Sequence, residues 1–126
     1  MAPAAHASTI LPAVPCASNN NGISNWVHLY YPNDDHPAMC IAGQGSEPVK
    51  GTIYSVCGGN NSGVLRGNWA DEAPGDSVTV AFNPKSVTIW NGDFKEAQYL
   101  TPRAAIGLVD ISVIDIYGAH GDATCK

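Results

Sequence analysis

Charged residues are scarce in this chain, at 13% of 126 residues, which is about half of the usual share. Six Lys and Arg stand against eleven Asp and Glu, and the basic residues are scattered rather than clustered. Because binding to a phosphate backbone needs clustered positive charge, the composition excludes nucleic acid as a partner. No stretch approaches the run of about 18 apolar residues that marks a transmembrane helix, so we expect no membrane span.

The sequence also lacks the local patterns that several enzyme classes require. A Gly-x-Ser-x-Gly nucleophile turn is absent, and the glycines at 58 and 59 are followed by no lysine, unlike a phosphate-binding loop. Three acidic pairs could serve as glycosidase carboxylates, but solvated charges in turns are the simpler interpretation of Asp34-Asp35, Asp71-Glu72 and Asp93-Glu96. We therefore expect no enzymatic activity.

Four cysteines are present, at Cys16, Cys40, Cys57 and Cys125. An even number in a small, lysine-poor chain favours disulfides, and four cysteines allow three pairings. We prefer Cys40–Cys57, which closes a short hairpin, with Cys16–Cys125, which ties the two ends together. The sequence contains no Cys-x-x-Cys and no histidine at zinc-knuckle spacing, so we expect no metal site.

The first residues resemble the end of a signal peptide. Ala5-His6-Ala7 has the small-x-small pattern of a signal-peptidase site, although no apolar segment precedes it. We interpret the chain as beginning just inside such a signal, with Met1 added; an alanine-rich tail is the alternative. Residues 1–23 are predicted to form a flexible arm held only at Cys16, and residues 24–126 a single secreted domain.

Apolar and polar residues alternate through most of the chain, with turn-forming residues between the runs. This pattern predicts an all-β sandwich or barrel of about eight short strands. Helical periodicity is poor, and its best example is a single turn at 102–108. The predicted strands are 26–31, 38–42, 52–57, 64–69, 77–82, 86–90, 98–100 and 109–117.

The last of these strands changes phase along its length. The apolar residues first stand at odd positions, at Val109, Ile111 and Val113. They then stand at even positions, at Ile114 and Ile116. A slip of one residue in a period of two is the effect of a β-bulge. We predict a bulge near Val113 and Ile114.

One segment resembles a βγ-crystallin Greek-key motif. Ser86–Tyr99 has a strand that ends in an aromatic residue, a tight turn, a Phe corner and a second aromatic residue, and a Ser-x-Ile strand follows. Trp90, Phe94, Tyr99 and Ser112 occupy these places. Because Trp90 follows an apolar alternating run, we expect it to pack inside. The resemblance implies a Greek-key β-sandwich cross-linked by disulfides.

The earlier half of the chain resembles small secreted crystallin-like proteins of actinobacteria, the Streptomyces killer-toxin-like family. The shared features are a cysteine near an Ala-Gly pair, here Cys40–Gly43, and a turn with two asparagines, here Gly58–Asn61. The calcium clamp of the βγ-crystallin family is not intact, because only Asp110 and Ser112 remain as oxygen ligands and calcium needs several. We therefore expect no cofactor.

Five residues are the candidates for binding: Gln44, Glu47, Asn60, Asn61 and Trp69. Trp69 stands in a polar segment, where an indole can stack on a sugar ring. Asn60 and Asn61 form a polar turn whose residues tolerate positive φ. Gln44 and Glu47 lie in the segment 44–50, which we expect to protrude as a loop.

The resemblance implies a secreted, non-enzymatic, monomeric toxin-like or antimicrobial protein. Because the net charge is −5, we expect it to act on competing microbes through a specific cell-surface or cell-wall component rather than by disrupting membranes. Two alternatives remain: an inhibitor that presents the 44–50 loop to a secreted protease, and a carbohydrate-binding module or small hydrolytic domain.

Overall fold

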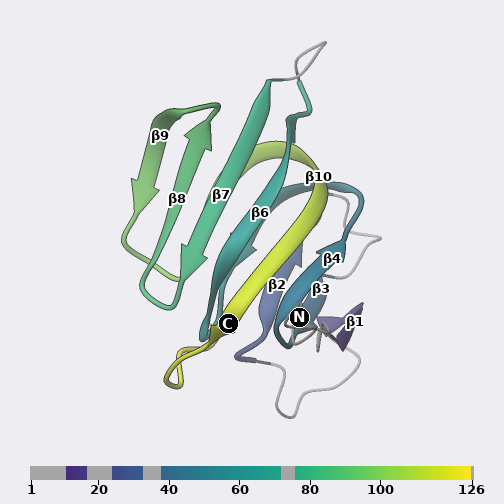
Figure 1. Cartoon of the computed structure of the whole chain (residues 1–126), viewed down its shortest axis with the longest axis vertical. Helices are drawn as coiled ribbons and strands as arrows, with labels where there is room; N and C mark the ends of the chain where they lie inside the picture. Colours follow the sequence, from purple (N-terminus) through teal and green to yellow (C-terminus); the bar gives the residue numbers. More distant parts are fainter. Residues whose placement is uncertain (1–10, 17–23, 33–37, 72–75, 126) are drawn as a thin grey trace, which may run out of the picture.

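The computed structural model describes residues 11–16, 24–32, 38–71 and 76–125, and these residues form ten strands and no helix. The all-β prediction is confirmed, but the strand count is ten, not eight. None of the described residues forms a helix that could span a membrane. The strands (Figure 1) are β1 Leu11–Pro15, β2 Val27–Tyr30, β3 Met39–Ala42, β4 Gly45–Pro48, β5 Thr52–Cys57, β6 Asn61–Trp69, β7 Ser77–Asn83, β8 Ser86–Asn91, β9 Phe94–Tyr99 and β10 Arg103–Ala119.

All strands belong to one antiparallel sheet in the order β1-β3-β2-β5-β10-β6-β7-β8-β9, and β4 also pairs with β10. The strand β10 joins two halves of this sheet, because its first part pairs with β5 and its later part with β6. The halves face each other, and side chains from both fill the space between them. The result is a sandwich-like fold built from a single sheet.

The strand β10 is sharply curved, and Figure 1 shows it as an arch that turns back behind β6 and β7. Cys57 and Asn61 lie at the two ends of one short turn, yet they pair with opposite ends of β10, at Arg103 and Ala119. The ends of β10 must therefore come close together. Gly107, at a φ of 89°, supplies the bend, and the pairing with β5 shifts register there.

The predicted bulge in this strand is confirmed. Pairing with β6 shifts register between Ile111 and Val113, so that Ile111 and Ile114 both face the core. The predicted helical turn at 102–108 is wrong. Strand β10 already begins at Arg103, and the curvature at Gly107 interrupts the alternation that would have indicated a strand.

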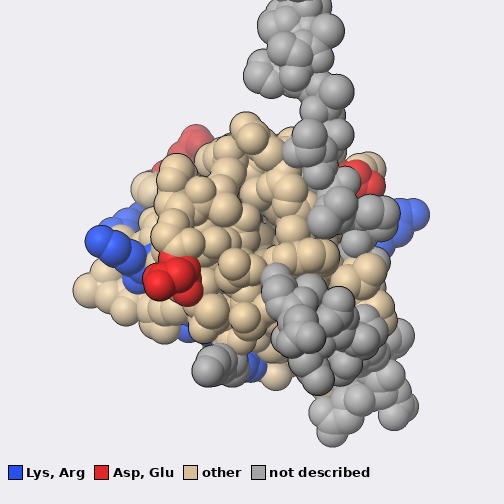
Figure 2. All heavy atoms as spheres, turned by 90° about the horizontal axis from the view of Figure 1, so that it is seen from below, with Lys and Arg blue, Asp and Glu red and all other residues tan. Residues whose placement is uncertain are grey.

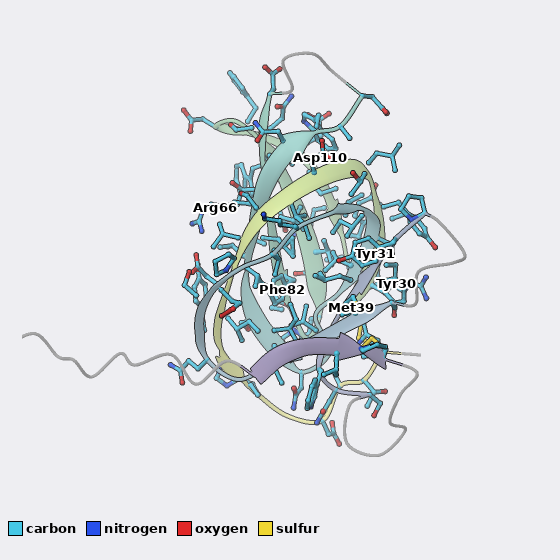
Figure 3. All side chains as sticks on the ribbon, turned by 90° about the vertical axis from the view of Figure 1, so that its right-hand side faces the viewer. Tyr30, Tyr31, Met39, Arg66, Phe82 and Asp110 are labelled. Carbon is cyan, nitrogen blue, oxygen red and sulfur yellow. A yellow bond between two sulfur atoms is a disulfide. The ribbon has the colours of Figure 1, made fainter. Side chains whose placement is uncertain are left out.

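The core consists of aliphatic side chains, with Phe82 placed between the two halves (Figure 3). One aromatic residue lies elsewhere than expected. We predicted that Trp90 packs inside, but Ile89 holds the core position and Trp90, the next residue, lies half-buried on the opposite face of β8. The core residues are Val27, Leu29, Ile41, Val49, Ile53, Val56, Leu65, Val78, Val80, Phe82, Val87, Ile89, Ala104, Ile106, Val109, Ile111, Ile114 and Ile116.

All four cysteines are bonded, as predicted, but the preferred pairing is wrong. The disulfides are Cys16–Cys40 and Cys57–Cys125. The strand β2 lies between β3 and β5, and its His28 pairs with Cys40 on one side and Cys57 on the other. Cys40 and Cys57 therefore lie on strands two places apart, which are separated by about 9–10 Å. This separation is too large for the predicted Cys40–Cys57 bond, because a disulfide needs Cα atoms within about 7 Å.

The predicted N-terminal arm contains a strand. Residues 11–15 form β1, which pairs with β3, so backbone hydrogen bonds hold this segment in addition to the disulfide at Cys16. The proline-rich sequence of β1 concealed it, because proline is rare inside strands. The signal-like motif Ala5–Ala7 and the acidic pair Asp34-Asp35 lie outside the described residues.

Candidate binding site

A depression of about 370 Å³ opens at the end of the molecule where β6 begins and β10 ends. We call it the polar depression. It brings together three of the five predicted binding residues: Gln44 from the β3–β4 connection, Asn60 from the β5–β6 turn and Asn61 from the start of β6. The complete lining is Asn25, Trp26, Ala42, Gly43, Gln44, Asn60, Asn61, Gly118 and Ala119.

The β5–β6 turn forms one wall of the polar depression. Gly59, and neither asparagine, takes the positive φ of this turn, 60°. The turn packs on the backbone before β2, where the Asn60 amide donates to Asn25 O at 3.1 Å. The side chain of Asn61 is buried and donates from Nδ2 to Asn25 O at 2.9 Å and to Gly58 O at 3.1 Å. Asn61 therefore fixes the shape of the wall.

The segment after β10 supports this wall from behind. Asn60 Nδ2 donates to Gly121 O at 2.9 Å, and the His120 amide donates back to Asn60 O at 2.7 Å. The Cys125 amide donates to Ser24 O at 2.6 Å, and Cys125 is cross-linked to Cys57. The wall is thus tied to three parts of the chain, which favours a preformed site.

The chemistry of the polar depression is uncharged. Its polar side chains are amides, its aromatic side chain is the half-buried Trp26, and glycine and alanine complete the lining. Figure 2 looks at this end of the molecule, and most of the described surface there carries neither Lys or Arg nor Asp or Glu. Amides paired with an indole suit a neutral ligand with hydroxyl or amide groups.

Trp69, another predicted binding residue, lies far from the polar depression. β6 begins at the depression with Asn61 and ends at Trp69. The indole is half-buried, packs against the core and covers the bend at Gly107, at 3.3 Å from the place of a Cβ atom there. This position gives Trp69 a role in packing.

Glu47, the fifth predicted binding residue, lies in strand β4 and does not line the polar depression. Glu47 pairs with Ile114 of β10, and the buried Val49 donates its amide to Ser112 O at 3.0 Å. The expectation that 44–50 protrudes as a loop is therefore wrong. The run Gly-Ser-Glu-Pro resembles a turn in sequence, but it pairs with the later part of β10.

Each of the two remaining clamp residues makes a hydrogen bond to another part of the protein. Thr52 donates its hydroxyl hydrogen bond to Asp110, which is labelled in Figure 3, and Ser112 donates to Arg66 O at 3.1 Å. Among the described residues, one group of three side chains has metal-ligand chemistry: Cys16, His28 and Cys40.

The sequence places His28 and Tyr30 on one face of a strand, and the structure agrees. Their rings stack with centroids 6.0 Å apart, and the guanidinium of Arg103 lies 3.9 Å from the centroid of Tyr30. Burial raises the pKa of Tyr30, and the charge of Arg103 opposes that shift. His28 Nδ1 lies 2.9 Å from Trp26 O, so Nδ1 carries the proton and donates to the carbonyl.

Burial lowers the pKa of His28 below its usual 6.5, more strongly than the hydrogen bond to Trp26 raises it. The unfolded chain therefore binds more protons than the folded chain between the lowered pKa and 6.5. We expect the free energy of unfolding to be highest above pH 6.5 and to fall as the pH drops through this window. Urea unfolding at a series of pH values, from about 7.5 to about 5, measures the effect.

The matched control is His28→Asn, whose amide can still donate to Trp26 O. Its loss of stability over the same pH range should be smaller than that of the unmodified protein. Equal slopes for the two proteins would show that His28 is not the titrating group.

Sequence reasoning did not select Trp26 as a binding residue. The sequence gives little sign of a binding role for Trp26, because this residue begins an alternating run and so has the pattern of a strand residue.

Comparison of the chain with protein-family profiles, with curated proteins and with solved structures gave no significant match.

Proposed function

We propose that this protein is a secreted, non-enzymatic binding protein whose polar depression holds a neutral component of another microbe's cell surface. One observation carries the proposal: the fold gathers Gln44, Asn60 and Asn61 beside Trp26 in one uncharged hollow. Such a lining matches the hydroxyl and amide groups of a cell-wall glycan. The toxin-like or antimicrobial activity implied by the resemblance would begin with this binding.

The disulfides support secretion, because two such bonds suit an oxidising, extracellular environment.

The Greek-key, crystallin-like assignment is part of the proposal. Strands β6 to β9 follow one another as hairpins, and β10 returns to lie beside β6, the first of them. A Greek key likewise brings a later strand back beside the first strand of a run of hairpins, but its run has three strands and the run here has four.

The position of β4 argues against a protease inhibitor. A reactive segment has to enter the cleft of the protease, but Gly45–Pro48 is hydrogen-bonded along β10 and Val49 is buried. The carbohydrate-binding alternative, by contrast, becomes part of the leading proposal, with Trp26 in place of Trp69.

Binding to insoluble cell-wall polysaccharides tests the proposal. The unmodified protein should be retained on at least one wall preparation, and Trp26→Ala should weaken retention about two- to tenfold, because an aromatic contact contributes about 0.5–1.5 kcal/mol. Gln44→Ala, on the exposed rim, should weaken it less without touching the core. A growth-inhibition panel with the same proteins connects binding to toxicity.

The control is Trp90→Ala, which removes another half-buried tryptophan from a strand outside the polar depression. This variant should bind like the unmodified protein. If Trp90→Ala and Trp26→Ala lose binding equally, or if no wall preparation retains the protein, the proposed site is wrong.

A further inference from the structure

A second site lies on the outer face of the β1-β3-β2 part of the sheet. Cys16, His28 and Cys40 each offer one metal-ligating atom, and these atoms all lie within 4.8 Å of one another. Two of the atoms are the sulfurs of a disulfide. The depression proposed above does not include these side chains, so this site is independent of the proposed function.

Backbone pairing holds the three residues in place without the disulfide. His28 lies directly opposite Cys40 on the neighbouring strand, so their side chains point to the same face. Cys40 also pairs with Val14 of β1, and the Cys16 amide donates to Ala38 O at 2.8 Å. Opening the disulfide would therefore leave the two sulfurs near the imidazole.

One nitrogen of the imidazole remains available to a metal. Nδ1 donates to Trp26 O, which leaves the lone pair of Nε2 for coordination. A histidine that binds a metal through one nitrogen usually donates from the other to a carbonyl or a carboxylate, and this contact fixes the ring. His28 and Cys40 are buried, whereas Cys16 is half-exposed and gives access from solvent.

We propose that reduction of Cys16–Cys40 creates a two-cysteine, one-histidine site for a thiophilic divalent metal ion such as Zn²⁺. A dithiol reductant gives two electrons and two protons to the disulfide and becomes a cyclic disulfide itself. The two new thiols lose their protons when the metal binds as a dithiolate. Three protein ligands and a water molecule complete a tetrahedral zinc site.

Metal titration of the oxidised and the fully reduced protein tests the inference. Zn²⁺ is measured by competition with a chromophoric chelator, and Co²⁺ serves as a spectroscopic probe of thiolate ligation. The reduced protein should bind one ion per chain and show thiolate-to-Co²⁺ charge-transfer absorption, and the oxidised protein should show neither. His28→Asn should weaken Zn²⁺ binding at least tenfold, because it removes one of three ligands.

Full reduction also frees Cys57 and Cys125, so two double variants assign the site. Cys57→Ser with Cys125→Ser should keep metal binding after reduction, and Cys16→Ser with Cys40→Ser should lose it. Far-UV circular dichroism follows the fold in each case. The inference is overturned if the reduced chain binds no Zn²⁺, if it stays unfolded with Zn²⁺ present, or if the Cys16→Ser, Cys40→Ser variant still binds.

Discussion

Replacing Gly59 by alanine is expected to lower the free energy of unfolding by about 3 kcal/mol or more. Two costs add at this position. The φ of Gly59 is 60°, which costs a residue with a side chain about 1–2 kcal/mol. A Cβ atom would also lie 2.5 Å from Trp26 O and closer still to Asn25 O, and both are backbone atoms that cannot move alone.

Gly92→Ala is the matched control, because Gly92 has almost the same φ, 61°, and nothing within 4 Å of the place of its Cβ. Gly92→Ala should lose only the unfolding free energy that a side chain costs at this positive φ. Urea unfolding of the two variants therefore separates steric clash from backbone strain. If both variants lose the same stability, the turn does not pack on Asn25 and Trp26 as described.

The same glycine matters to the polar depression, because the Asn60 and Asn61 contacts with Asn25 depend on the close approach that Gly59 allows. We expect any folded Gly59→Ala protein to bind wall polysaccharide more weakly than the unmodified protein. Gly92→Ala, in the β8–β9 turn, should bind normally.

Strands with regular alternation were predictable from the sequence. Ser77–Asn83 and Ser86–Asn91 alternate strictly, because one face of each packs on the core and the other does not. The change of phase at Ile114 likewise revealed the bulge. Strands β1 and β4 were missed because both contain proline and have little apolar alternation, and their place in the sheet depends on distant partners.

The pairing of the cysteines depended on strand order, which local patterns do not contain. Cys40 and Cys57 read as the two sides of a hairpin because they are near in sequence. The insertion of β2 between them comes from pairing across the sheet. The position of a cysteine in the apolar–polar alternation of its strand shows which face of the sheet it takes. It does not show which strand lies next to it.

The candidate site was partly predictable, because some of its residues have a local sequence pattern and others do not. Gln44, Asn60 and Asn61 could be selected because polar residues next to glycine mark turns, and turns gather at the ends of a sheet. Trp69 was misplaced because its polar sequence neighbours concealed its packing over Gly107. Trp26 could join the site only through the tertiary contact between its backbone and the β5–β6 turn.

Removal of the Cys57–Cys125 disulfide is expected to have the largest effect of all, about 4.4 kcal/mol of unfolding free energy. This bond closes a loop with a sequence separation of 68, whereas Cys16–Cys40 closes one of 24. The same chain-entropy relation gives about 3.5 kcal/mol for the shorter loop. Each double variant, with both cysteines replaced by alanine, removes two sulfur atoms, so their comparison isolates the position of the cross-link.

The two variants should also differ in binding. Cys125 holds the segment that supports Asn60, through Gly121 and His120, whereas Cys16 and Cys40 lie outside the lining of the polar depression. Under conditions where both variants are folded, Cys57→Ala with Cys125→Ala should lose wall binding, and Cys16→Ala with Cys40→Ala should keep it. Equal binding by the two would mean that the segment after β10 does not shape the site. Binding lost only in the Cys16, Cys40 variant would place the ligand on the face that carries His28.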